Sequence, residues 1–178
     1  PPGGTALVEE SIKEALDFRR AMRKVDKDFG REWWFKVWGP DKLVADGIGT
    51  REQWMLGANE KWHGFGNLAT GFNLLDPIKS TIVTPGLDVA GKFAKTGIPA
   101  SIVTKFLAEH GVVVEKTGLY SFFIMFTIGI TKGRWNTMLT ALQQFKDDYD
   151  KNAPLWRILP EFCAAHPRYE RMGLRDLC

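Results

Sequence analysis

The order of apolar patterns between residues 78 and 149 is the feature that most constrains the fold. β-Branched runs typical of strands alternate there with runs whose apolar residues recur at helical spacing, and prolines and glycines separate them. The predicted segments are a strand at 78–84, a helix from Pro99 to Gly111, strands at 112–114 and 120–128, and a helix from Trp135 to Tyr149. This order predicts an α+β fold, with a small antiparallel or mixed sheet that carries its helices on one face.

Further elements are predicted on both sides of this unit. A long helix at 5–29 precedes an aromatic strand at 33–38 and an aromatic-rich loop at 41–75, and a loop of that length is usually functional or packed on a neighbour. A helix at 155–165 follows, and 168–178 looks like the start of another helix. We therefore expect three parts: a connecting helix and loop (1–75), a β–α–β–β–α lobe (76–150) and a helical segment (151–178).

Composition excludes several classes of protein. The chain has 178 residues, of which 44% are hydrophobic and 25% charged, which is ordinary for a folded domain. The net charge is +3, and the longest basic cluster, at 19–24, lies beside aspartates in a helical pattern, so nucleic-acid binding is not expected. The most apolar stretch, 119–130, is too short to span a bilayer. The two cysteines lack metal-ligand spacing, and Pro1–Gly4 does not resemble a secretion leader, so we expect a cytoplasmic protein with free thiols and no metal.

Few residues carry a chemical signal. No phosphate-binding glycine loop and no nucleophile elbow is present. Trp62 and His63 lie in the long loop and are candidates for a pocket, although the interpretation that we favour is that Trp62 and Phe65 pin that loop to the core. Glu115 follows the predicted strand at 112–114, where a carboxylate beside an apolar sheet could bind a cationic ligand. The alternative for Glu115 is a solvated charge at a surface turn.

Several blocks together resemble the bacterial ornithine/lysine/arginine decarboxylases, which are large fold-type-I enzymes that use pyridoxal 5'-phosphate. They occur in that family's order and spacing: Trp62–Phe65, Leu75–Lys79, Gly97–Val103, Val113–Gly118, Thr131–Trp135 and Met172–Leu177. The resemblance implies that this chain follows the cofactor-binding domain of a longer enzyme. It also implies that the 76–150 lobe is the aminotransferase-like small domain and that 151–178 leads to a further C-terminal domain.

The resemblance also implies where the chemistry lies. The family binds its cofactor through the lysine of a Ser-x-His-Lys motif, whereas glycine follows His63 and His110 here and proline follows His166. We therefore expect no catalytic residue in this chain, no covalently bound pyridoxal phosphate and no activity on its own.

The implied partners follow from the same family. Glu115 matches a glutamate associated with substrate binding and is expected to pair with the distal cation of lysine, arginine or ornithine. Trp62 and His63 are possible pocket or interface residues, and the parent enzyme is expected to form a homodimer or a higher homo-oligomer. Two alternatives remain: a stand-alone ferredoxin-like module that binds an amino acid for regulation, and a purely structural assembly domain.

Overall fold

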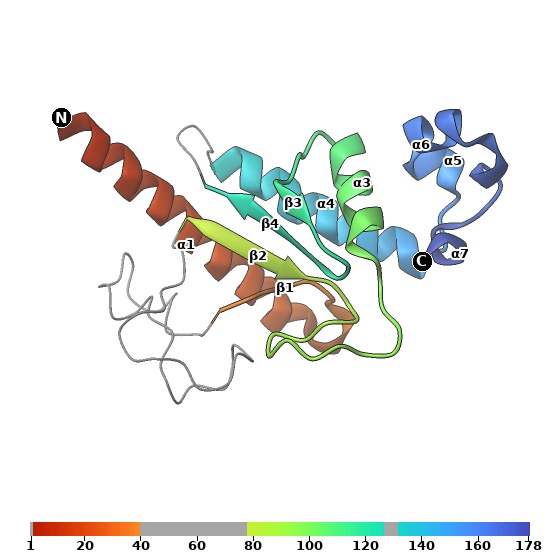
Figure 1. Cartoon of the computed structure of the whole chain (residues 1–178), viewed down its shortest axis with the longest axis horizontal. Helices are drawn as coiled ribbons and strands as arrows, with labels where there is room; N and C mark the ends of the chain where they lie inside the picture. Colours follow the sequence, from red (N-terminus) through yellow and green to blue (C-terminus); the bar gives the residue numbers. More distant parts are fainter. Residues whose placement is uncertain (1, 40–77, 127–131) are drawn as a thin grey trace.

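The computed structural model describes residues 2–39, 78–126 and 132–178 (Figure 1). In this part of the chain the strands are β1 (Lys36–Val37), β2 (Lys79–Val83), β3 (Lys116–Thr117) and β4 (Ser121–Met125). The α-helices are α1 (Pro2–Phe29), α3 (Ala100–Glu109), α4 (Lys132–Asp150), α5 (Leu155–Ile158), α6 (Pro160–Ala165) and α7 (Leu174–Leu177). Two short 3-10 helices, η1 (Gly30–Glu32) and η3 (Pro167–Tyr169), complete the described elements.

The four described strands form one antiparallel sheet in the order β1-β2-β4-β3. Ile82 lies at its centre, since it pairs with Val37 on one side and with Phe122 on the other. Alternate residues of a strand point to opposite faces, which places Val37, Ile82 and Phe122 on the same buried face. The predicted α+β class, with a small antiparallel sheet, is confirmed.

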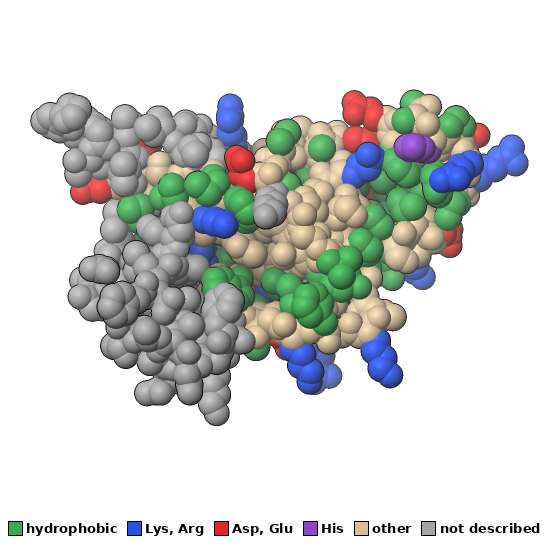
Figure 2. All heavy atoms as spheres, in the orientation of Figure 1, with side chains coloured by type: hydrophobic (Ala, Val, Ile, Leu, Met, Phe, Trp, Pro, Cys, Tyr) green, Lys and Arg blue, Asp and Glu red, His purple; other side chains and the backbone are tan. Residues whose placement is uncertain are grey.

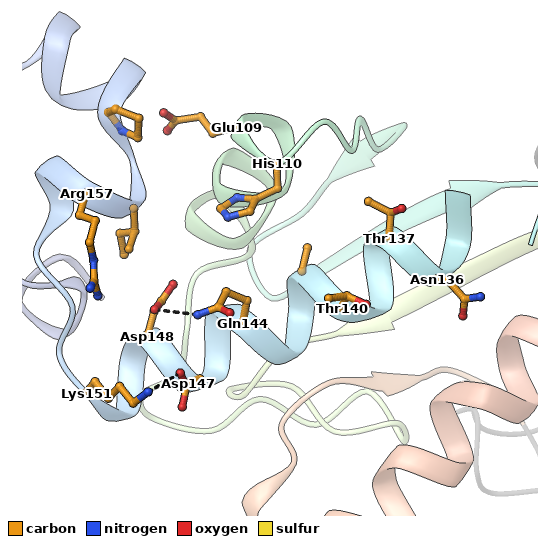
Figure 3. A pocket seen from close by; sticks show the side chains of 13 residues that line it. Glu109, His110, Asn136, Thr137, Thr140, Gln144, Asp147, Asp148, Lys151 and Arg157 are labelled. Atoms are coloured by element: carbon orange, nitrogen blue, oxygen red, sulfur yellow. Dashed lines mark hydrogen bonds and ion pairs between the residues drawn. The ribbon is translucent and has the colours of Figure 1, made fainter. Parts of the chain in front are cut away.

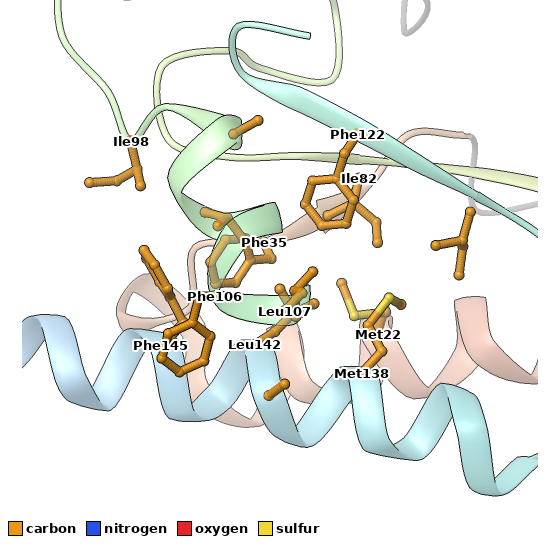
Figure 4. Close-up of a cluster of buried hydrophobic side chains, with 14 of the residues drawn as sticks. Met22, Phe35, Ile82, Ile98, Phe106, Leu107, Phe122, Met138, Leu142 and Phe145 are labelled. Carbon is orange, nitrogen blue, oxygen red and sulfur yellow. The ribbon is translucent and has the colours of Figure 1, made fainter. Parts of the chain in front are cut away.

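Helices α1, α3 and α4 supply the other half of the core. Helix α4 contacts both α1 and α3, and these two helices contact the strands (Figure 1). Figure 4 shows side chains from all three helices meeting those of the sheet. Aromatic rings join the layers: the centroid of Phe145 lies 5.3 Å from that of Phe106 and 6.0 Å from that of Phe35, both at edge-to-face angles. Many of the described aromatic residues are thus core residues.

The connection between β2 and α3 returns tightly on itself. The Thr84 hydroxyl donates a hydrogen bond to the Ile98 carbonyl at 2.6 Å, and the Ile98 amide donates to the Pro85 carbonyl at 2.7 Å. Gly97 lies between these contacts, where a Cβ atom would stand 2.1 Å from the Pro85 carbonyl oxygen. Two backbone segments therefore pass each other at a distance that only glycine permits.

A buried arginine fixes the place where the chain leaves β1 and enters β2. The Arg19 side chain is 1% exposed, and its two terminal nitrogens donate to the carbonyls of Trp38 at 3.0 Å and Lys79 at 2.9 Å. Burial, with a smaller contribution from nearby Arg23, lowers the pKa of Arg19 to about 10. Since the folded pKa lies below the unfolded value, the charge costs stability at every pH below about 10. The two carbonyl contacts offset part of that cost.

Replacing Arg19 with lysine is expected to lower the free energy of unfolding by about 1–2 kcal/mol, because an ammonium cannot reproduce a fork that spans two carbonyls. Urea unfolding followed by circular dichroism measures the loss. Arg20→Lys is the matched control, since Arg20 is more exposed and bonds to Asp17 on the surface, and a change below about 0.5 kcal/mol is expected there. Equal losses in both variants would show that the fork does not stabilise the fold.

The predicted strand at 112–114 is wrong. Helix α3 ends in a Schellman turn, in which the amides of Gly111 and Val112 donate to the carbonyls of Ala108 and Leu107, with Gly111 at φ +80°. The chain must then cross from the helix layer to the sheet edge, so 112–114 spans the gap and Val113 is 87% exposed. Pairing begins only at Lys116, which forms β3 with Thr117.

Three other predicted elements differ from the structure. The aromatic strand at 33–38 shortens to Lys36–Val37, because Trp33 and Phe35 pack into the core instead of extending the sheet. The helix at 155–165 is broken into α5 and α6, since Pro160 lacks an amide hydrogen and disfavours helical geometry at Leu159. The segment 168–178 holds only η3 and α7, and Arg175 of α7 caps the end of α4 by donating to the carbonyls of Tyr149 and Asp150.

Candidate functional site

A cavity of about 540 Å³ lies where the segment after α3 meets β4 and the first turns of α4. Ile124, Met138 and Trp135 give it buried apolar walls. The charged residues of its described lining are Glu115 and Arg134, and no lysine is among them. The full described lining is Gly111, Val112, Val113, Glu115, Ile124, Met125, Arg134, Trp135, Thr137 and Met138.

Glu115 is held by the sheet through its main chain and is exposed through its side chain. Its amide donates to the Phe123 carbonyl at 3.1 Å, one residue before β3 begins. The carboxylate therefore stands at the start of an edge strand, not after the end of one as the sequence predicted. Within the described part of the chain this carboxylate has no hydrogen-bond or ion-pair partner, so it is free to bind a cation.

Arg134 reaches the same cavity from the first turn of α4. It is exposed, and its guanidinium has no hydrogen-bond or ion-pair partner among the described residues. Sequence reasoning did not single it out as a site residue, because nineteen positions in the sequence separate it from Glu115 and no motif joins the two. Only the antiparallel fold brings the two residues to one cavity.

Trp135 is a fixed wall of this cavity. The side chain is 5% exposed, and its indole nitrogen donates to the Glu14 carboxylate of α1 at 2.6 Å. Its ring also meets Phe18 edge-on, with the centroids 6.2 Å apart. Helix α1, which is distant in sequence, thus holds one aromatic wall beside Glu115 and Arg134.

A second cavity, of about 830 Å³, lies between α3, α4 and α5 (Figure 3). Its acidic residues already have partners in the protein: Glu109 accepts from the Glu161 amide, Asp147 pairs with Lys151, and Asp148 accepts from Gln144. His110 bonds to the Phe106 carbonyl at 2.7 Å and stacks on that ring. Only the contact of Glu109 joins two helices, α3 and α6, and the others lie within one helix or at its end. Because these side chains are already engaged, the cavity with Glu115 is the better candidate site.

The remaining candidate residues are Trp62, His63, His166 and the two cysteines. Trp62 and His63, with the rest of the loop at 41–75, lie outside the described residues. The His166 ring packs on Phe162, with centroids 5.0 Å apart, as expected of a structural histidine. Cys163 and Cys178 are free thiols, and burial raises the pKa of Cys178 to about 11, which keeps its reactive thiolate form scarce at neutral pH.

Three broader features bear on function. No helix in the described part of the chain is both long enough and apolar enough to cross a membrane. No cluster of metal-ligating side chains occurs among the described residues either. On the face drawn in Figure 2, the Lys and Arg side chains are scattered around the described surface and do not gather into one patch.

Comparison with known proteins identifies the family to which this chain is related. The chain is 50% identical to the lysine decarboxylase LdcA of Pseudomonas aeruginosa over 99% of its own length and 24% of the relative. It is 34% identical to the biodegradative arginine decarboxylase of Escherichia coli and 32% identical to the inducible ornithine decarboxylase of a Lactobacillus strain. Each of these two alignments covers 98% of the chain and 25% of the relative.

Solved structures agree with the sequence relatives. Lysine decarboxylase A from Pseudomonas aeruginosa matches with a TM-score of 0.88 and 50% identity, over 99% of this chain and 24% of that one. The Escherichia coli constitutive lysine decarboxylase matches with a TM-score of 0.85 and 37% identity, over 98% and 24%. The chain thus spans about a quarter of the length of its relatives. Because the model for the major domain of Orn/Lys/Arg decarboxylases matches residues 2–134, the chain belongs to the Orn/Lys/Arg decarboxylase family.

Proposed function

We propose that this chain is the substrate-recognising part of a pyridoxal-phosphate-dependent decarboxylase that converts lysine, arginine or ornithine into the corresponding amine and CO2. The observation that carries the proposal is the Glu115 carboxylate, which has no partner among the described residues, in an apolar-walled cavity of a family member. Relatives named as lysine, arginine and ornithine decarboxylases support the substrate class. A stand-alone regulatory module would share the strand–helix order but would not account for this family match.

The cavity suits a basic amino acid in two respects. A carboxylate that none of the described residues binds offers a charge-assisted hydrogen bond to a distal ammonium or guanidinium. The walls formed by Ile124, Met138 and Trp135 offer an apolar surface to the methylene stem that precedes such a cation. Glu115 is therefore proposed as a binding residue, and Trp135, held by Glu14, as a wall that positions the stem.

The described residues do not fit the cofactor itself. Pyridoxal phosphate would supply an electron sink for the loss of CO2, and in this family the lysine of a His-Lys pair would hold it, but that pair is absent from this sequence. The described lining of the cavity with Glu115 contains no lysine. Among the described lysines that line other cavities, Lys146 and Lys151 form ion pairs with Asp150 and Asp147, and Lys105 lies over the Phe162 ring, 5.2 Å from its centroid. We therefore propose that cofactor and chemistry belong to the rest of a longer protein.

The 178-residue chain alone is expected to bind no pyridoxal phosphate covalently and to release no CO2 from lysine, arginine or ornithine. Absorbance in the visible range after incubation with the cofactor, and a CO2 assay, measure both. The longer protein that carries this segment is the positive control and is expected to do both. Stoichiometric cofactor attached to one lysine of this chain would refute the proposal that the cofactor is held by the rest of a longer protein. A longer protein without decarboxylase activity would refute the proposed function.

The location, oligomeric state and domain arrangement of the parent enzyme are part of the same proposal. We expect a cytoplasmic homodimer or a higher homo-oligomer that acts in amino-acid metabolism. Exposed apolar side chains, among them Phe93, Val113 and Trp156, support contact with further protein. Residues 1–75 are proposed as the connection from the cofactor domain, 76–150 as the small domain, and 151–178 as the lead into a C-terminal domain.

A further inference from the structure

Two opposite charges line one cavity. Glu115 enters from the sheet edge before β3, and Arg134 enters from the first turn of α4. Among the described residues neither side chain forms an ion pair or a hydrogen bond, and the two are not paired with each other. A cavity lined by a cation and an anion that the described residues leave unpaired matches a ligand that carries both charges.

The position of Arg134 adds a second reason to expect an anion there. The first turn of an α-helix has amide groups without intrahelical partners and the positive end of the helix dipole. Helix α4 has 19 residues and no acidic residue in its first turn, so its own side chains do not neutralise that end. A carboxylate beside Arg134 would meet a guanidinium and a helix N-terminus together.

The cavity that the two charges line also has apolar walls. Ile124 and Met138 are buried, and Trp135 is fixed by its hydrogen bond to Glu14 at 2.6 Å. A methylene chain can therefore lie along a preformed surface while its two ends meet opposite charges. Lysine and its homologues have this layout: a carboxylate at one end, an apolar stem and a distal cation.

From this geometry we infer that the cavity captures a free basic amino acid at two points, with Arg134 binding its carboxylate and Glu115 its distal cation. The inference rests on the proposed function for Glu115 and assigns a new role to Arg134. The contact with Arg134 belongs to capture, since a carboxylate held in an ion pair is stabilised in the ground state and must be released before it can leave as CO2. Arg134 is thus a specificity residue for binding and not a catalytic one.

A consequence is discrimination between substrate and product. Loss of CO2 removes the carboxylate and leaves a diamine, which has no group for Arg134. The second cation of the diamine is repelled by the guanidinium if it approaches the end of the cavity near α4. The cavity should therefore hold the amino acid and release the amine, which favours turnover in the forward direction.

Binding to the 178-residue chain tests this directly, because no cofactor is needed. Isothermal titration or NMR titration is carried out with lysine, with the diamine formed from lysine by loss of CO2, and with norleucine, which lacks the distal amine. Lysine should bind about three- to tenfold more tightly than either analogue, a range that allows for the exposure of both charged side chains. Equal affinity for lysine and the diamine, or no lysine binding, would overturn the inference.

Arg134→Gln gives the sharper result. Lysine affinity should fall about three- to tenfold, whereas the diamine should bind unchanged or slightly more tightly because a repelling cation is gone. Glu115→Gln should weaken both ligands. Arg171→Gln is the matched control: Arg171 is exposed, lies beyond α6 and does not line the cavity, so neither ligand should respond. Parallel losses for lysine and diamine in Arg134→Gln would refute a carboxylate contact.

The outcomes separate this inference from the proposed function. Active decarboxylation by the longer protein together with an unresponsive Arg134→Gln variant would remove Arg134 and leave the function standing. An inactive longer protein with the expected binding pattern would keep the two-point site and remove the reaction.

Discussion

Gly97→Ala is expected to lower the free energy of unfolding by about 3–5 kcal/mol, near the upper end for a single added methyl group. The new Cβ would stand 2.1 Å from the Pro85 carbonyl oxygen and 2.5 Å from the Gly86 Cα atom. Both neighbours are backbone atoms, so no side chain can rotate away. The crossing must open, which also strains the hydrogen bond from Ile98 to the Pro85 carbonyl. Thermal and urea unfolding measure the loss.

The same loop offers a matched control for this substitution. Gly91→Ala adds a methyl group at a position with φ +85° and no atom within 4 Å, so only backbone strain is expected, at about 1–2 kcal/mol. If both variants lost the same stability, conformational strain would explain Gly97 and the close approach would not matter. Because the loop leads directly into α3, a loosened crossing is also expected to disturb the segment that carries Glu115.

Prolines and a glycine at the ends of segments made the central lobe predictable from the sequence. Pro77, Pro85, Pro99 and Gly111 bound segments whose periods are clear, and the corresponding strand and helix are present as β2 and α3. The class and the antiparallel possibility followed from the order of those segments. The strand order β1-β2-β4-β3 could not be predicted, because it depends on which edges pair in three dimensions.

Errors arose where a local pattern competed with a tertiary requirement. Three valines at 112–114 have a strong preference for strands, but the Schellman turn at Gly111 uses that segment to cross between layers. Arg19 belongs to a basic cluster that is typical of a solvated helix face, although Ala15 and Met22 share its stripe on α1 and are buried with it. A charged residue in phase with apolar neighbours was the signal that could have identified it.

The candidate site was predictable only in part. Glu115 could be singled out because it follows an apolar run in a block that resembles a known family. Arg134 and Trp135 could not be linked to it, since their shared cavity depends on the pairing of β3 with β4 and on the return of the chain into α4. The contact between Glu14 and Trp135 joins residues 121 positions apart, which no local pattern encodes.

Glu115→Gln in the longer enzyme is expected to lower kcat/KM for the native dibasic substrate about ten- to a hundredfold. Glutamine keeps the shape and a hydrogen-bond acceptor but removes the charge, and a charge-assisted contact in a closed site is worth about 1.5–3 kcal/mol. Steady-state CO2 release measures the change. Glu10→Gln is the matched control, because Glu10 is an exposed carboxylate of α1 that does not line the cavity.

The choice of substrate shows what Glu115 recognises. An analogue without the distal charge should lose little with Glu115→Gln, because it never made the contact, whereas the native substrate should lose most of its advantage over that analogue. Cofactor absorbance should be unchanged, since the cofactor is proposed to be held elsewhere. Equal losses for both substrates would mean that Glu115 acts on the reaction itself. No loss for either would make Glu115 a solvated charge at a turn, and the free carboxylate of this cavity would then have no role in substrate recognition.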